Sequence, residues 1–153
     1  MITFFVPLAV LAGGLAAGGL MISALGGAPM LLALPVDSYL PVHKLLVGRF
    51  DPFMPICIVT ALLSDVAVAV LAPTGVTHTL AAAAAVLYLC VMSVSLTKNV
   101  PINRWIATLD PANPPADWQR VDPRVKWRNW NLVRTTFAVL ALVVNVAAVG
   151  FLV

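Results

Sequence analysis

The sequence predicts an all-α protein: a bundle of four transmembrane helices with both termini on the same side of the membrane. Hydrophobic residues make up 61% of the 153 residues and charged residues only 10%, whereas a soluble domain carries about 25% charged residues. A chain this short cannot hide so much apolar surface from water, so lipid is its natural solvent. Four apolar runs each supply the ~20 residues that a spanning helix needs. We therefore expect a single membrane domain over 1–153.

The expected spans cover about 2–24, 52–72, 77–96 and 133–153, and a continuation of the first span toward 34 is left open. The first lacks the positively charged start of a signal peptide, and its GLAAG pattern at 14–18 is typical of close helix packing in lipid, so we expect it to be retained. Asp51-Pro52 and Asp122-Pro123 each place a capping side chain before a proline that suits a first helical turn. Helices are therefore expected to begin there, the second of them well before the bilayer.

Two polar connections, 35–51 and 97–132, join the first span to the second and the third to the fourth, so they share one side. All nine Lys and Arg lie in these connections or at their helix margins: Lys44, Arg49, Lys98, Arg104, Arg120, Arg124, Lys126, Arg128 and Arg134. The positive-inside rule then places the connections in the cytoplasm and both termini outside the cytoplasmic membrane. Because the positive charge is accounted for by the orientation of the helices across the membrane, we expect no nucleic-acid partner.

The second connection opens with KNVPINRW at 98–105. Pro101 removes a backbone donor and disfavours helix at Val100, so a break in the helix is expected here. Broken backbone at membrane depth needs polar partners from the protein. Asn99 and Asn103 could cap the two sides of such a kink, or at least one of them could point its amide into a pocket.

Aromatic residues indicate a functional mouth on the connection side. A generic aromatic belt has Trp and Tyr at both membrane interfaces. Here all four tryptophans lie on the connection side: Trp105, Trp118, Trp127 and Trp130. On the fourth helix Trp127, Asn131 and Arg134 share one face at i, i+4 and i+7. Arg134 lies about one turn inside the apolar run, so it either snorkels to the interface or faces the bundle interior as a binder of anions or oxygen atoms.

His43 lies on the same side as the tryptophans, near Tyr39. With an unperturbed pKa of ~6.5 it could act as a general base. It is also the only candidate metal ligand on this side, but a lone histidine does not make a zinc site. A haem held by two histidines is not expected, because His78 falls on the opposite side. The cofactor content is left open between none and a metal.

A second, smaller polar set lies within the apolar runs and comprises Asp65, His78 and Asn145. An intramembrane carboxylate is a candidate functional group. The alternatives are a neutral Asp65 that bonds a neighbouring helix, or a proton relay or ion site. Cys57 and Cys90, also in apolar runs, are expected to behave as small hydrophobes.

NVPINR at 99–104, a Trp-containing loop, and WRNWNLVR at 127–134 before a last apolar helix together resemble the anthrone oxygenase-like family of four-helix membrane proteins. The resemblance covers most of the chain. It carries over the positions Asn99, Pro101, Asn103, Trp127 or Trp130, Asn131 and Arg134, and less sharply His43. It implies a link to oxidation of anthrones to anthraquinones, as in some fungal relatives, although most bacterial relatives have no assigned reaction.

Three functional hypotheses follow. The first is a membrane oxygenase or oxidoreductase for a flat aromatic, phenolic or quinone-like substrate, with His43 as base and with Asn103 and Arg134 stabilising the developing oxyanion. Its expected substrate-binding residues are Tyr39, Asn99, Trp105, Trp127, Trp130 and Asn131. The alternative is a non-catalytic accessory subunit or lipid-binding partner of a larger membrane complex or homo-oligomer. The third is a transporter built on Asp65.

Overall fold

The computed structural model describes residues 1–73 and 75–151, and in these ranges the chain is all-helical, at 86% helix, with no strand. In chain order its elements are α1 (Ile2–Ile22), the π-helical turn η1 (Ser23–Gly27), α2 (Ala28–Ala33), α3 (Val36–Phe50), α4 (Phe53–Leu71), α5 (Val76–Val94), the π-helical turn η2 (Ser95–Asn99), α6 (Val100–Thr108), α7 (Trp118–Val121) and α8 (Arg124–Val149).

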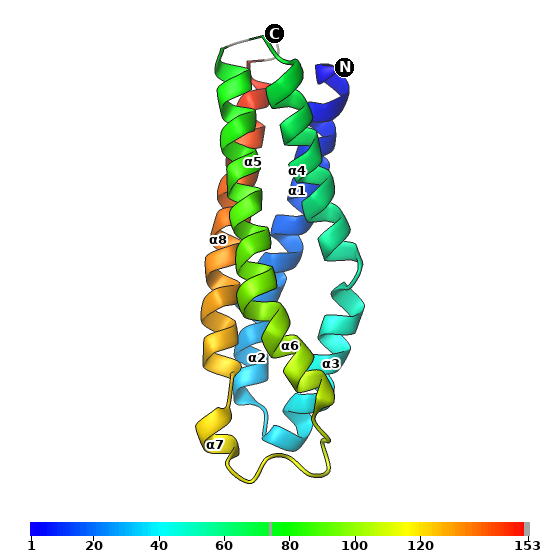
Figure 1. Ribbon diagram of the computed structural model, residues 1–153, viewed down its shortest axis with the longest axis vertical. Helices are drawn as coiled ribbons and strands as arrows, with labels where there is room; N and C mark the ends of the chain where they lie inside the picture. Colours follow the sequence, from blue (N-terminus) through cyan, green and yellow to red (C-terminus); the bar gives the residue numbers. More distant parts are fainter. Residues whose placement is uncertain (74, 152–153) are drawn as a thin grey trace.

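Four helical segments within the described ranges are long and apolar enough to cross a membrane: Ile2–Ala33, Phe53–Leu71, Val76–Thr108 and Trp118–Val149, the last of them made of α7 and α8. The N-terminus and the C-terminal end of α8 lie at one end of the bundle, here called the terminal end, and α3, α6 and α7 form the opposite connection end (Figure 1). Helix α1 packs against α4 and α8, and α5 packs against α4 and α8. The prediction of a four-helix membrane bundle is confirmed.

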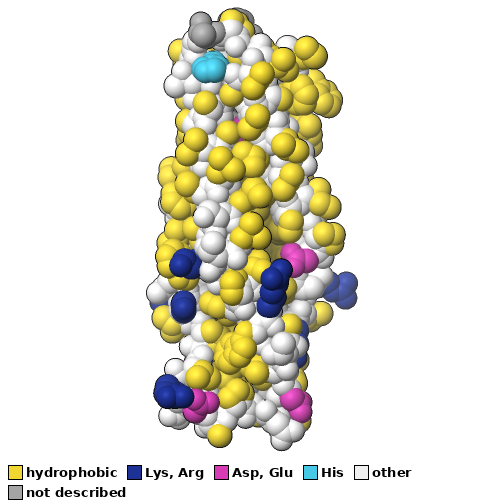
Figure 2. All heavy atoms as spheres, viewed as in Figure 1, with side chains coloured by type: hydrophobic (Ala, Val, Ile, Leu, Met, Phe, Trp, Pro, Cys, Tyr) yellow, Lys and Arg dark blue, Asp and Glu magenta, His cyan; other side chains and the backbone are white. Residues whose placement is uncertain are grey.

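Small side chains make up much of the centre of the bundle, and many large apolar ones face outward. The buried core contains alanines from every span, among them Ala16, Ala61 and Ala138, each fully covered. Large apolar side chains such as Leu63 and Val143 lie on the outer surface, and Figure 2 shows this yellow surface over the upper part of the molecule. Close approach through small residues is the usual packing in lipid, where burial of apolar groups gives no driving force between helices.

At Gly13, α1 lies against the side chain of Tyr88, which reaches across from α5. A Cβ atom added there would overlap the hydroxyl of Tyr88, whereas one added at Gly18 would meet nothing within 4 Å. Gly13→Ala is therefore expected to destabilise the bundle by about 1–3 kcal/mol through overpacking. Gly18→Ala should be neutral or slightly stabilising, because alanine favours the helix.

Unfolding in mild detergent, followed by circular dichroism, measures this difference. Adding Tyr88→Phe to Gly13→Ala should restore most of the lost stability, because it removes the overlapping hydroxyl, which has no hydrogen-bond partner in the structure. Equal stabilities of the Gly13→Ala and Gly18→Ala variants would contradict the packing described here.

Pro101 does not break the helix, contrary to the prediction. Val100 is helical, with φ −60° and ψ −43°, and the third span runs on to Thr108. The reason is η2, a π-helical turn that ends two residues before Pro101. A proline ring clashes with the carbonyl four residues earlier, here that of Thr97, and a π-helical turn widens the helix at that point. The chain therefore bends without stopping.

The first span shows the same device, with η1 ending two residues before Pro29. As a result, this span does not end near 24 but reaches Ala33, the continuation that the sequence had left open. At the expected helix starts, Asp122 accepts a hydrogen bond from the backbone N–H of Arg124 at 3.0 Å. Asp51 does not cap α4, which has no side-chain cap; instead it lies at a cavity wall.

Candidate functional site

A cavity of about 420 Å³ lies in the connection half of the bundle, where the π-helical turns bend the first and third spans. Its size suits a small organic ligand. Its wall is mostly apolar and includes Met30, Met54 and Met92, flexible side chains that adapt to ligands of irregular shape. The polar side chains of the wall come from five elements and their ends: Ser23, His43, Asp51, Ser95, Asn103, Trp127 and Arg134.

Three of these residues form a hydrogen-bonded chain. The indole Nε1 of Trp127 donates to Asn103 Oδ1 at 2.8 Å, and His43 Nε2 lies 3.1 Å from the same oxygen. An indole N–H can only donate, so it fixes the orientation of the Asn103 amide. An oxygen acceptor then requires His43 to carry its proton on Nε2. In neutral His43 the Nδ1 atom is therefore the bare, basic nitrogen.

His43 is held between aromatic rings. Its ring centroid lies 5.4 Å from that of Tyr39, one turn earlier on α3, and 5.3 Å from that of Trp127. The side chain is buried, and Nδ1 has no hydrogen-bond partner. Burial lowers the pKa of His43, and the bond to Asn103 opposes this shift. His43 is therefore neutral at pH 7, as a general base must be.

Arg134 lies at the other polar region of the cavity. Its Nε and Nη2 atoms donate to Asn131 Oδ1 at 3.0 and 2.8 Å, and Nη1 lies 3.3 Å from Ser95 Oγ. Asn131 in turn donates to Ser23 Oγ at 3.3 Å. The two serines are the first residues of η1 and η2. Each π-helical turn therefore supplies one serine to the hydrogen bonds that hold the guanidinium, Ser95 directly and Ser23 through Asn131.

Asn99 and Asn103 have different places. Asn103 lines the cavity, whereas Asn99 is fully buried behind it and donates from Nδ2 to the carbonyl of Trp127 at 3.1 Å. This bond ties η2 to the first turns of α8, on which Trp127 lies. Asn99 and Asn131 thus position other side chains and do not themselves line the cavity.

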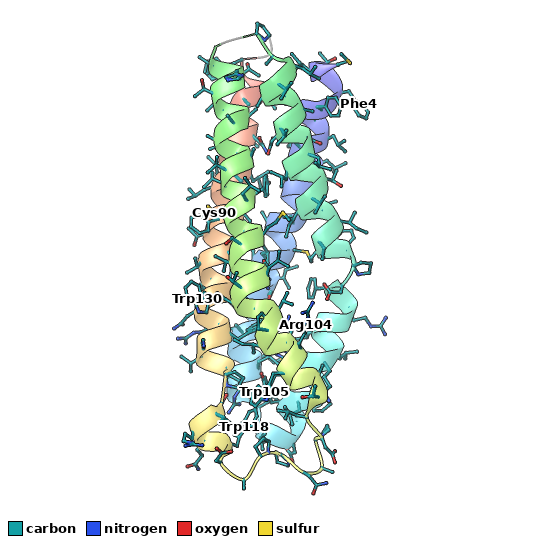
Figure 3. The ribbon with its side chains drawn as sticks, in the orientation of Figure 1. Phe4, Cys90, Arg104, Trp105, Trp118 and Trp130 are labelled. Carbon is teal, nitrogen blue, oxygen red and sulfur yellow. The ribbon has the colours of Figure 1, made fainter. Side chains whose placement is uncertain are left out.

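Three further residues expected to bind substrate lie outside the cavity wall. Tyr39 is buried behind His43, with Arg124 stacked 5.2 Å from its ring centroid. Trp105 stacks on Trp118 at 6.2 Å, and both lie together at the connection end (Figure 3). Trp130 projects from the outer side of α8, where Lys98 lies 5.1 Å from its ring centroid.

Ser23, Ser95, Asp51 and the cavity methionines were not expected from the sequence. For the two serines a signal does exist, because each stands six residues before a proline in an apolar span: Ser23 before Pro29 and Ser95 before Pro101. In the structure a π-helical turn begins at each of these serines.

The second polar set lies apart, nearer the terminal end. Asn145 Nδ2 donates to Asp65 Oδ2 at 3.2 Å, and both side chains are buried. His78 is half-buried at the start of α5 and makes no hydrogen bond to either residue. Within 1–73 and 75–151, no three His, Cys, Asp or Glu side chains group as a metal ion would require.

A family model described as anthrone oxygenase matches residues 46–144. The match runs from α3 into α8 and includes Asn103, Trp127 and Arg134, while His43 lies three residues before it. Neither a curated protein nor a solved structure matches the chain.

Proposed function

Because the chain belongs to the anthrone oxygenase family, we propose that it is a membrane oxygenase for a flat, phenolic or quinone-like aromatic substrate. The observation that carries the proposal is that one apolar cavity holds a buried histidine with an unpartnered Nδ1 and an arginine that pairs with no carboxylate among the described residues. The distribution of Lys and Arg further supports a cavity near the cytoplasmic face, with both termini outside.

The reaction would begin with removal of a proton from the activated CH₂ group of an anthrone by His43 Nδ1. The carbanion places its charge on the carbonyl oxygen, where the guanidinium of Arg134 stabilises it. Dioxygen adds to the carbon, and the resulting peroxide anion takes back the proton that His43 removed, which gives a hydroperoxide and restores the neutral base. Loss of the second C–H proton then breaks the O–O bond, forming the new carbonyl and releasing hydroxide, which is protonated to water. One anthrone and one O₂ thus give one anthraquinone and one water.

Asn103 and Trp127 support the base and do not exchange protons in this scheme. Their hydrogen bonds keep the Nε2–H tautomer, and Asn103 Oδ1 stabilises the imidazolium that forms when Nδ1 takes the proton. Neighbouring side chains cover Nδ1 in the structure. The scheme therefore requires a rotation of the imidazole or of Tyr39 when substrate binds, since catalytic contacts often tighten only in the substrate complex.

The purified protein in nonionic detergent is expected to convert anthrone to anthraquinone with one O₂ consumed per quinone formed. An oxygen electrode and quinone absorbance measure both quantities. Absence of binding and of turnover with anthrone, quinol and naphthol compounds, with and without added metal, would remove the support for an oxygenase.

The pH dependence of this reaction gives a separate prediction. The base is active when neutral, so kcat/KM should fall about tenfold per pH unit below the pKa of His43. Since burial places that pKa below its ordinary value of 6.5, the acid limb should have its midpoint below 6.5. An acid limb centred above 6.5, or one that persists in a His43→Gln variant, would contradict the assignment of His43.

A further inference from the structure

The cavity meets the outer surface through apolar side chains of the spans. Ile22, Met30, Val59 and Leu96 all line it and are 39–68% exposed. They come from η1 and its neighbours, from α4 and from η2, segments that belong to the membrane-spanning helices. The open parts of the cavity wall therefore face lipid between the first and second spans and between the second and third.

These openings lie where the hydrocarbon layer ends. Measured from the terminal end, the ~20 residues that cross a bilayer core reach about Met21 on the first span, Pro52 on the second and Ser95 on the third. The charged residues Arg49, Asp51, Lys98 and Arg104 follow at this level or just beyond it. Figure 2 shows Lys and Arg confined to the lower half of the visible face.

Arg134 lies in this wall and forms no ion pair with a described carboxylate. The ion pairs of the described chain are Arg120–Asp117 and Arg124–Asp122, and neither involves it. Its acceptors are the neutral oxygens of Asn131 and Ser95, and the Ser95 hydroxyl proton is directed to the carbonyl of Val91 at 2.7 Å. Asn131 fixes one edge of the guanidinium. A charged group this deep in a spanning helix is costly unless a ligand or partner of opposite charge completes it.

We propose that the cavity takes its ligand sideways from the membrane, and that this ligand is an apolar molecule carrying one acidic oxygen group, a carboxylate or a phenolate, which binds Arg134. The proposal rests on the proposed function and names its substrate class and route. An amphiphile of this kind would lie in the bilayer with its acid at the hydrocarbon boundary and its body in the apolar layer. The protein matches this arrangement, because the arginine lies at the same boundary and the openings face the apolar layer.

Asp51 opposes such an anion. It is exposed and lines the same cavity as Arg134, but it forms no ion pair with it. It therefore lowers the positive potential that an incoming acid would meet. Removing its charge should strengthen binding of an acid and leave binding of a neutral ligand unchanged.

Equilibrium binding of two fluorescent probes tests the proposal: anthracene-9-carboxylate and its neutral analogue anthracene-9-methanol, with the full-length protein in lipid nanodiscs. Arg134→Gln should raise the Kd of the carboxylate at least about tenfold, the loss of one charge-assisted contact, and change that of the alcohol less than about twofold. Asp51→Asn should lower the Kd of the carboxylate only. Arg104→Gln, which changes an exposed arginine outside the cavity wall, is the matched control.

Equal losses of carboxylate affinity in Arg134→Gln and Arg104→Gln would overturn the proposal, because attraction would then be a general surface effect. Equal losses for both probes in Arg134→Gln would overturn it as well. In either case continued turnover of neutral anthrone by the wild type would leave the proposed oxygenase standing. Failure of the wild type to bind either probe, together with absence of turnover, would remove the proposed function itself.

Discussion

Replacing His43 with glutamine is expected to lower kcat for anthrone oxidation by about 10²–10⁴-fold, the usual contribution of a general base. The glutamine amide can still donate to Asn103 Oδ1, the acceptor that now holds His43 Nε2. The support of the cavity wall therefore remains, while the basic nitrogen is lost. Steady-state kinetics in nonionic detergent measure the change, and KM should move far less than kcat because His43 mainly serves the chemical step.

His78→Gln supplies the matched control, because His78 is the other histidine of the sequence and lies near the terminal end. It should retain wild-type kcat. Equal activity of the His43→Gln variant and the wild type would exclude His43 as the base.

Replacing Asn131 with leucine is expected to lower the free energy of unfolding by about 3 kcal/mol. Asn131 is fully buried, and its Oδ1 atom is the acceptor for two nitrogens of Arg134. Removing it leaves a charged group without its principal partner at membrane depth, which costs more than the loss of an ordinary hydrogen bond. Chemical unfolding in detergent, followed by tryptophan fluorescence, measures the change.

Asn129→Leu is the control, because Asn129 is exposed on the same helix and bonds only Arg128; it should change stability by less than about 0.5 kcal/mol. Adding Arg134→Met to Asn131→Leu should recover most of the loss, since apolar replacement of both partners is often nearly neutral. A double variant less stable than Asn131→Leu would show that Asn131 does not act through Arg134.

Composition and the four apolar runs were sufficient to predict the bundle, and the positions of the tryptophans drew attention to the connection end. Helical spacing also placed Trp127, Asn131 and Arg134 on one face and left open whether Arg134 reaches the interface or faces the interior; the structure places its side chain in the cavity wall, bonded to Asn131. Spacing within a helix could not show how that helix is rotated against its neighbours, and therefore which of its tryptophans face the cavity. Trp105 and Trp130 stand at the same interface but contact Trp118 and Lys98, and those contacts depend on how α6 and α8 are rotated against their neighbours.

The continuation of the helix through Pro101 could not be predicted from the sequence, for a different reason. Proline predicts a lost hydrogen bond and a clash, but not the manner in which the chain relieves them. A π-helical turn adds one residue to the helix, and this shifts the direction of every side chain that follows it. The outcome determines that Asn99 lies behind the cavity wall and Asn103 in it. The pair therefore looked equivalent in sequence and has two separate roles in the structure.

Photolabelling tests most directly whether a flat aromatic ligand occupies the cavity between His43 and Arg134. A light-activated benzophenone reacts readily with methionine, and the five methionines of this chain fall into two classes. Met30, Met54 and Met92 line the cavity, whereas Met1 and Met21 are exposed elsewhere. We expect 4-benzoylbenzoate to label Met54 and Met92, and anthrone to suppress that labelling. Labelling mainly at Met1 and Met21, or labelling that anthrone does not reduce, would contradict the account.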